Sequence, residues 1–230
     1  MSLKIHILGC GNFGRRALEY YAARSKGPEG CEIVLVDSEK EHLAAARRQF
    51  PREGEGCKSV CRPADDYLAG LLRKPPVPGR DWIIPTVPFH LAAAALCRVL
   101  QRRPRAWEKP PALPNLFLAA EGREACSSLA DFICPADCPQ PRTHCYQTGL
   151  PRDPSLLRIL ARLDYRLDGR RLLSLVMAST QVAPGLGGFP LQRLYRLMLY
   201  IRDRHPESLL FSTACRCHGV TSILGPAGDR

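Results

Sequence analysis

Residues 3–37 read LKIHILGCGNFGRRALEYYAARSKGPEGCEIVLVD, and this stretch decides the fold of the first part of the chain. The apolar run at residues 3–8 predicts a strand, and the helical spacing of apolar residues predicts a helix over residues 12–24. Residues 32–36 predict a second buried strand, which ends at Asp37. A strand, a helix and a strand in this order predict two parallel strands joined by a right-handed crossover.

The alternation of strands and helices continues to about residue 104, and the predicted fold class is therefore α/β. We expect helices over residues 39–50, 65–72 and 89–101, and strands near residues 58–61 and over residues 81–86. A linker is predicted by Pro104, Pro110, Pro111 and Pro114. These patterns predict that residues 1–104 form a dinucleotide-binding domain on a Rossmann-like parallel sheet.

Residues 105–230 predict a smaller C-terminal α/β part with a cysteine-rich insertion. We expect helices over residues 154–163 and 189–204, and strands over residues 115–120, 172–178, 208–214 and 220–224. Gly185, Gly187 and Gly188 precede the last helix. They predict either a flexible turn or a loop that holds an anionic substrate.

The segment GCGNFG places Gly9, Gly11 and Gly14 in the spacing G-x-G-x-x-G, between a predicted strand and a predicted helix. In a dinucleotide site the first glycine permits a tight turn, the second lets the backbone approach a pyrophosphate, and the third lets helix and strand pack closely. The phosphates then meet free N–H groups at the helix N-terminus, where the helix dipole favours negative charge. The predicted cofactor-binding residues are Gly9, Cys10, Gly11, Asn12, Phe13, Gly14, Asp37 and Thr86.

Asp37 lies 23 positions after Gly14, close to the spacing expected of the carboxylate that binds the adenosine ribose. A carboxylate accepts hydrogen bonds from the 2′-hydroxyl and repels a 2′-phosphate, which favours NAD over NADP. Lys40, Arg15 and Arg16 lie nearby in the sequence and leave NADP open. Two other interpretations also stay open: a Rossmann fold that has lost its ligand, and one that binds another adenine nucleotide.

Residues 1–100 resemble the nucleotide-binding domains of potassium-uptake regulatory proteins, of the RCK or TrkA-N type. The resemblance is carried by GCGNFG, by Asp37 and by the stretch CRPADDYL, in which Asp65 falls near the acid that follows that family's third strand. It implies a Rossmann fold and a bound nucleotide. It does not extend to the C-terminal half.

The residues after the fourth predicted strand read PTVPFH and are expected at the carboxyl edge of the sheet, where ligands of open α/β folds bind. Thr86 and His90 are thereby placed near the nicotinamide or the substrate. Because imidazole titrates near neutral pH, His90 is a candidate catalytic acid or base, and a surface helix cap is the alternative. His6, inside the first predicted strand, is expected to be a packed core residue.

Five of the eleven cysteines gather in two short segments. ICPADCPQPRTHC contains Cys134, Cys138 and Cys145, and ACRCHG contains Cys215 and Cys217. In a reducing cytosol clustered cysteines bind metal or take part in redox chemistry, so these five predict a site for structural Zn²⁺ or for an iron–sulfur cluster. Dispersed buried thiols and a redox pair are the alternatives. The histidines beside the outer cysteines are His144 and His218.

The net charge of +11 is spread over both halves, with 19 basic and 12 acidic side chains in residues 1–115 and 14 and 10 in residues 116–230. No RRM, helix-turn-helix or zinc-finger pattern accompanies this charge, which favours small anionic molecules over nucleic acid as ligands. No apolar run approaches the roughly 18 to 20 residues needed to cross a bilayer, and the N-terminus lacks the pattern of a signal peptide. We expect a cytoplasmic protein without membrane insertion, and leave open whether it forms a homo-oligomer.

Two functional classes follow from these patterns. The first is an NAD-dependent oxidoreductase that acts on a small anionic substrate between the two parts of the chain. The second is a non-catalytic, nucleotide-sensing regulatory module with a structural zinc or iron–sulfur site. A sensor needs little beyond its nucleotide-binding domain. The additional C-terminal α/β part, with its cysteine cluster, therefore favours the enzyme.

Overall fold

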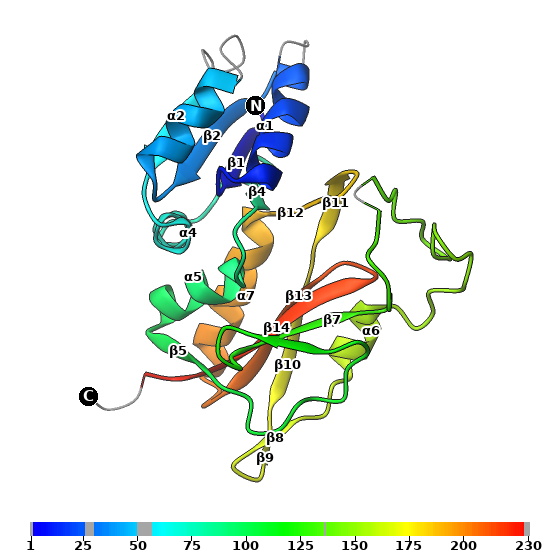
Figure 1. The fold of residues 1–230 in the computed structure, drawn as a ribbon. Helices are drawn as coiled ribbons and strands as arrows, with labels where there is room; N and C mark the ends of the chain where they lie inside the picture. The colour runs from blue at the N-terminus through cyan, green and yellow to red at the C-terminus, as the bar shows by residue number, and fades with distance from the viewer. Residues whose placement is uncertain (1, 26–29, 50–56, 136, 228–230) are drawn as a thin grey trace.

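The structure, a computed structural model, is mixed α/β and describes residues 2–25, 30–49, 57–135 and 137–227 (Figure 1). In the first part strands and helices alternate in the order that the apolar spacing predicts. The strands are β1 (Lys4–Leu8), β2 (Glu32–Asp37), β3 (Cys57–Cys61) and β4 (Asp81–Pro85). The helices are α1 (Asn12–Ser25), α2 (Lys40–Gln49), α4 (Ala64–Leu72) and α5 (Leu91–Leu100). Phe50, the last residue of the predicted second helix, lies outside the described residues.

These four strands are parallel neighbours in the order β3-β2-β1-β4. In this register Leu8, at the end of β1, pairs with Val36 on one side and with Pro85 on the other. The carboxyl ends of β1, β2 and β4 therefore lie at one edge of the sheet. The segment that follows β1 is flanked there by the segments that follow β2 and β4.

Two strands from the C-terminal half extend the same sheet. β11 (Thr180–Ala183) and β12 (Leu186–Pro190) form an antiparallel hairpin, and β12 pairs antiparallel with β4. The sequence predicted a turn or an anion-binding loop at the glycines of this segment. Gly185 does lie in the turn of the hairpin, whereas Gly187 and Gly188 belong to β12, which corrects the prediction for these two. Close packing explains Gly188, because a Cβ there would lie 2.6 Å from Ile84 Cδ1 and 2.9 Å from the Ile83 carbonyl oxygen.

The second sheet is mixed and has the order β10-β13-β14-β7-β6, with β5 also paired to β14. β10 and β13 are parallel, and the other pairs are antiparallel. Its strands are β5 (Arg102–Arg105), β6 (Phe117–Ala119), β7 (Glu124–Ser128), β10 (Leu173–Ala178), β13 (Leu209–Ala214) and β14 (His218–Pro226). The other elements are α6 (Leu156–Ala161), α7 (Leu191–Arg204) and a small hairpin of β8 (Arg166–Leu167) and β9 (Arg170–Arg171).

β5 corrects the prediction of a linker that begins at Pro104. Pro104 lies within this strand, opposite Leu224 of β14. Among the described residues β5 pairs with β14 alone, and a strand with one free side tolerates the missing N–H of a proline. The sequence RRPR has no apolar alternation, and pairing with a strand more than 100 residues later cannot be read from so short a segment.

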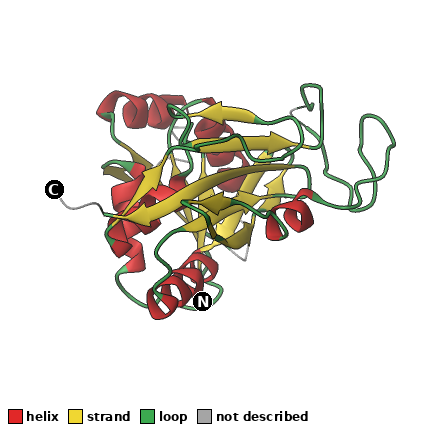
Figure 2. Ribbon diagram, turned by 90° about the horizontal axis from the view of Figure 1, so that it is seen from below, coloured by secondary structure: helices red, strands yellow, loops and turns green. Residues whose placement is uncertain are grey.

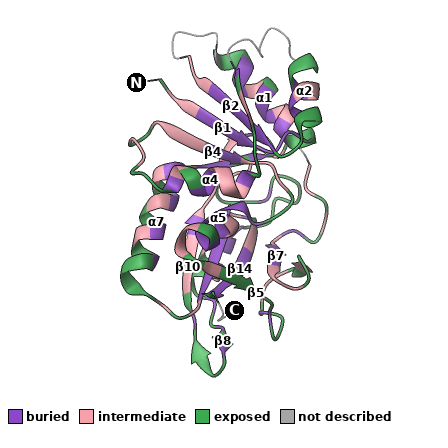
Figure 3. Cartoon of the chain, turned by 90° about the vertical axis from the view of Figure 1, so that its left-hand side faces the viewer, coloured by how far each residue is buried: buried purple, intermediate pink, exposed green. Residues whose placement is uncertain are grey.

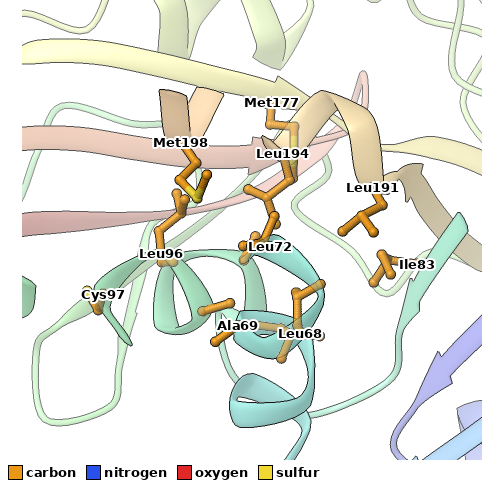
Figure 4. Packing of buried hydrophobic residues seen from close by; sticks show 14 of the residues in the cluster. Leu68, Ala69, Leu72, Ile83, Leu96, Cys97, Met177, Leu191, Leu194 and Met198 are labelled. Atoms are coloured by element: carbon orange, nitrogen blue, oxygen red, sulfur yellow. The ribbon is translucent and has the colours of Figure 1, made fainter. Parts of the chain in front are cut away.

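One apolar core connects the two sheets. In Figure 4 Leu72 of α4 and Leu96 of α5 approach Leu194 and Met198 of α7. The same cluster includes Val36 of the first sheet and residues of β10, β13 and β14 in the second sheet. β1, β2 and β13 are buried along most of their length, as Figure 3 shows for β1 and β2. The first part of the chain and the C-terminal half therefore share a core. Among the described residues no helix is long and apolar enough to cross a membrane.

Candidate functional site

The glycine loop, residues 9–14, joins the end of β1 to the first turn of α1 at the carboxyl edge of the first sheet. Gly9 has a φ of +109°, and a Cβ there would lie 2.9 Å from the Thr86 carbonyl oxygen. A Cβ on Gly14 would lie 1.9 Å from the Gly9 carbonyl oxygen, far inside van der Waals contact. Backbone shape therefore requires the first glycine, and the close approach of α1 to the loop requires the last.

The middle glycine of the loop has no such structural reason. A Cβ on Gly11 would meet no described atom within 4 Å. The backbone N–H groups that follow it, those of Asn12, Phe13 and Gly14, have no acceptor among the described residues, and the first turn of α1 carries no acidic side chain. Bare backbone, unpaired N–H groups and the positive end of a helix dipole together suit the binding of an anion.

Asp37, at the end of β2, lies beside this loop. Its Oδ2 accepts a hydrogen bond from the Cys10 N–H at 2.7 Å, and its Oδ1 accepts one from the Glu39 N–H at 2.9 Å. His42 Nδ1 lies 3.2 Å from Oδ1. The carboxylate thus connects the loop to the start of α2. Because each carboxylate oxygen can accept about two hydrogen bonds, Oδ2 keeps capacity for a hydroxyl group of a ligand.

Thr86 and Cys10 support the glycine loop from within the protein. The Thr86 hydroxyl lies 2.9 Å from the Leu8 carbonyl oxygen and 2.7 Å from the Gly9 carbonyl oxygen, so it donates into the loop. Cys10 is buried, and burial raises the pKa of its thiol to about 12. Through these contacts and those of Asp37, the eight residues predicted to bind a cofactor lie together at one edge of the sheet.

His90, the predicted catalytic residue, is enclosed in the core and is 3% exposed. Its Nδ1 lies 2.9 Å from Ser222 Oγ and its Nε2 lies 2.9 Å from Thr213 Oγ1, while its ring stacks on Phe211. Burial lowers the pKa of His90 to about 3, so the ring is neutral near pH 7. An enclosed neutral ring with both nitrogens engaged has no open path to a substrate, and we assign His90 to the core. It is also not the surface helix cap that was the alternative.

His6 lies in the core, as expected for its place in β1. The side chain is buried, with Nδ1 2.9 Å from Tyr67 Oη and Nε2 3.0 Å from Asp81 Oδ1. Burial lowers the pKa of His6, and the contact with Asp81 acts in the opposite direction.

The two cysteine segments meet at a cavity of about 660 Å³, which we call the thiol pocket. The residues of the predicted cluster that line it are Cys134, Cys138, Cys145, Cys215, Cys217, His144 and His218. Phe13 of the glycine loop, which is 54% exposed, also lines the pocket, as do Gly185 and Gly187 of the β11–β12 hairpin. The pocket therefore adjoins the loop that was predicted to bind the cofactor.

The first cysteine segment belongs to a long irregular connection between β7 and α6, drawn as loops in Figure 2. Backbone hydrogen bonds attach its two ends to the turn between β13 and β14: Leu129 N–H donates to the Cys217 carbonyl and Leu156 N–H to the Arg216 carbonyl, both at 2.8 Å. Gln181 of β11 donates its side-chain N–H to the Cys138 carbonyl at 2.6 Å. These bonds bring the two cysteine segments together although about 70 residues separate them in the chain.

Two of the pocket thiols are surrounded by hydrogen-bond donors. Cys215 Sγ accepts from the backbone N–H of His218 at 3.2 Å and from that of Cys217 at 3.5 Å. Burial opposes ionisation, yet these donors and the His218 ring lower the pKa of Cys215. The Thr148 hydroxyl, with smaller contributions that include Arg152, lowers the pKa of Cys145 to about 6.

His218 lies between two cysteines of the pocket. Its Nε2 is 3.4 Å from Cys134 Sγ and its Nδ1 is 3.8 Å from Cys215 Sγ. The two thiols thus face opposite sides of the ring. In the described part of the chain, no three His, Cys, Asp or Glu side chains are arranged to hold a metal ion. The predicted ligands converge on one pocket, while the zinc or iron–sulfur site itself stays a prediction.

Sequence reasoning missed several residues of the pocket, chief among them Arg152, which is 6% exposed. Arg152 follows a proline in an irregular segment, and nothing in its local sequence distinguishes it from the other arginines of the chain. Gln181 of β11 and Ser179, which directly precedes β11, also line the pocket. The dipeptide Pro184–Gly185 between two short apolar runs is a hairpin signal that could have located them.

Comparison with known proteins finds one relative that matches almost the whole chain and a family that matches its C-terminal half. A protein of Archaeoglobus fulgidus, described as "Uncharacterized protein", is 28% identical over 230 residues, which cover 95% of this chain and 97% of that protein. No solved structure matches the chain significantly. Residues 90–225, more than half of the chain and including both cysteine segments, match the family AF_1314_C, described as "Uncharacterized protein, C-terminal domain". The chain therefore belongs to this family.

Proposed function

We propose that the chain binds NAD(H) at the glycine loop, in a Rossmann-like arrangement, and acts as an oxidoreductase on a small molecule in the thiol pocket. The parallel order β3-β2-β1-β4 is that of the first four strands of the Rossmann order 3-2-1-4-5-6, and the glycine loop follows β1. Ligands of such sheets bind at the carboxyl ends of the strands, and the glycine loop and Asp37 both lie there.

The observation that carries this proposal is that packing requires two of the three glycines but not the third. Sterics require Gly9 and Gly14, whereas Gly11 faces open space beside unpaired N–H groups. A pyrophosphate needs this combination, because its oxygens approach bare backbone at a helix N-terminus. A Rossmann unit without a ligand would have no physical reason to keep a glycine at position 11.

Asp37 supports NAD over NADP in this proposal. Its carboxylate is held by two backbone N–H groups, at 2.7 and 2.9 Å, and keeps acceptor capacity at Oδ2. A ribose 2′-hydroxyl donates to such a group, whereas a 2′-phosphate is repelled by it.

The place of the thiol pocket supports an enzyme over a sensor. Phe13 belongs to the cofactor loop and lines the pocket, so a small molecule there would lie next to the dinucleotide. Bound NAD supplies hydride transfer, and the chain supplies the enclosure and the orienting groups. Gln181 and Ser179 contribute polar side chains to the pocket wall, and Thr213 stands between the pocket and the buried His90.

Calorimetry with NADH and NAD tests the binding step. We expect saturable binding that is at least about tenfold weaker in Gly11→Ala, because a methyl group there would occupy the place of a charged hydrogen-bonding ligand. The matched control is Gly70→Ala, whose Cβ would make only an ordinary contact at 3.7 Å with Arg62 Nη1. Neither substitution crowds the fold, so a loss of affinity in the first alone reports on the ligand. Absence of binding at millimolar NADH in the unaltered protein would end the proposal.

Turnover separates the enzyme from the regulatory alternative. An oxidoreductase is expected to change NADH absorbance in the presence of a carbonyl or imine substrate. A nucleotide-sensing module would instead bind NADH without turnover and change its oligomeric state or its affinity for a partner.

A further inference from the structure

Arg152 is an unusual residue for the wall of a cavity. Its side chain is buried, at 6% exposure, and it lines the thiol pocket. Its Nε has no hydrogen-bond acceptor among the described residues. A guanidinium carries five N–H donors and no acceptor, and it stays charged at all physiological pH values. The pocket therefore contains a permanent positive charge whose donors are not all used.

The other residues of the wall do not balance this charge with a carboxylate. Within the described part of the chain, none of the residues that line the pocket is Asp, Glu or Lys, so Arg152 is the one permanently charged group there. The side chains that interact with Arg152 are thiols, with Cys145 as a hydrogen-bond partner and with Cys217 and Cys134 close by. The neighbouring Asp153 is paired with Arg158 at 2.9 Å.

Burying a charge with unused donors is costly unless a partner completes its hydrogen bonds. Arginine meets a planar carboxylate or a phosphate with two parallel N–H···O bonds, which is the strongest arrangement open to it. A ligand with one of these oxyanions would accept hydrogen bonds from the guanidinium of Arg152 in the pocket wall.

We propose that Arg152 binds the oxyanion, a carboxylate or a phosphate, of the small molecule that occupies the thiol pocket, and holds that molecule against the sulfur of Cys145. This names the substrate class of the proposed oxidoreductase and rests on that function, although the anion site itself can be tested without NAD. The net charge of the chain indicates anionic ligands but does not say where they bind. The buried guanidinium of Arg152 indicates the binding site.

Iodoacetate and iodoacetamide provide a matched pair of probes. Both alkylate a thiolate: the sulfur attacks the methylene carbon, an S–C bond forms, the C–I bond breaks, and iodide leaves. The two reagents have nearly the same shape, but only iodoacetate carries a carboxylate. The ratio of their rates at Cys145 therefore measures recognition of the anion, while any change in the reactivity of the thiol itself cancels.

Peptide mass spectrometry gives this ratio at each cysteine of the full chain. Cys61, exposed and absent from the pocket wall, is the internal reference. We expect the iodoacetate-to-iodoacetamide ratio at Cys145 to exceed that at Cys61 by about tenfold or more, the effect expected of a charged hydrogen bond. Arg152→Gln should bring the two ratios together, and Arg152→Lys should keep part of the preference.

Arg216→Gln is the matched control variant. Arg216 also has a buried Nε without an acceptor and lies between Cys215 and Cys217, but it is not among the residues that line the pocket. We expect this variant to retain the preference of the unaltered protein. An equal loss in Arg216→Gln and Arg152→Gln, or no preference in the unaltered chain, would overturn the proposal.

A second measurement needs no variant and remains available if Arg152→Gln does not fold. Inorganic phosphate and succinate, each at matched ionic strength against chloride, should slow the alkylation of Cys145 and leave Cys61 unchanged. Protection by phosphate alone would select a phosphate ligand, and protection by succinate alone a carboxylate. Protection by neither would count against an oxyanion site. If the anion preference holds while calorimetry shows no NADH binding, the oxidoreductase proposal fails and the anion site stands.

Discussion

The glycine loop and the thiol pocket are adjacent, but they are built in different ways. The loop spans six consecutive residues between a strand and a helix, and its shape follows from Gly9 and Gly14. The pocket is assembled from two cysteine segments about 70 residues apart and from the β11–β12 hairpin, which belongs to the same sheet as the loop. A site formed by one continuous motif can therefore be located from the sequence, whereas a site built from distant loops depends on the whole fold.

The largest effect on stability is expected from a substitution that disrupts the glycine loop. Gly14→Ala should lower the free energy of unfolding by about 4 kcal/mol, above the usual range for overpacking, because the clash at 1.9 Å is with a backbone oxygen that cannot move aside. Urea denaturation followed by circular dichroism measures this change. Gly70→Ala is the control and should not destabilise the chain, since alanine is the better helix former. Equal stability of Gly14→Ala and the unaltered protein would contradict the close contact.

The parts of the protein that contain the glycine loop and the thiol pocket are expected to unfold together, because they share one core. Leu194→Ala, in the core shared by both sheets, should cost about 3 kcal/mol and leave one cooperative transition. Fluorescence and circular dichroism should give the same midpoint. Leu150→Ala, at an exposed position of the cysteine-rich connection, is the control and should change stability by about 0.5 kcal/mol or less. Two separate transitions in Leu194→Ala would show that the halves do not depend on one core.

Acid is expected to lower the stability of the protein by protonating His90, which is buried in the core behind the pocket. Burial lowers the pKa of His90 from 6.5 to about 3 in the folded chain. Between these two values the unfolded chain binds a proton that the folded chain does not, so stability should fall as pH decreases through this window and stay constant above it. His90→Gln removes this contribution, and urea unfolding at a series of pH values should show a weaker dependence on acid. An unchanged dependence would place the protonation elsewhere.

The smallest effect is expected at the pocket itself. Cys134→Ser, at a half-buried position in an irregular segment, should change the free energy of unfolding by about 0.5 kcal/mol or less. Differential scanning calorimetry measures this difference. A large loss would mean that the thiols stabilise the fold, as a structural metal site would, and elemental analysis of anaerobically purified protein would then identify zinc or iron.

The elements of the first part of the chain could be predicted because their signals are local. Apolar periodicity over residues 3–37 marks β1, α1 and β2, and it places Asp37 at a strand end beside the loop. β5 and β7 were missed because RRPR and EACSS show no such alternation and pair with β14, a strand from the other end of the chain. The burial of His90 could not be predicted for the same reason, since Phe211, Thr213 and Ser222 enclose it from distant strands.

The α/β alternation, the G-x-G-x-x-G spacing of the glycine loop and the gathering of five cysteines in two short segments could be read from the sequence alone. These features depend on neighbours within one or two elements, where steric rules and periodicity act directly. Three-dimensional packing sets the rest: the five cysteines line one pocket together with Phe13 and the β11–β12 hairpin, and among the described residues of its wall Arg152 is the permanently charged one. Burial and the distribution of charge around a side chain are properties of the assembled surroundings, and no local pattern of residues specifies them.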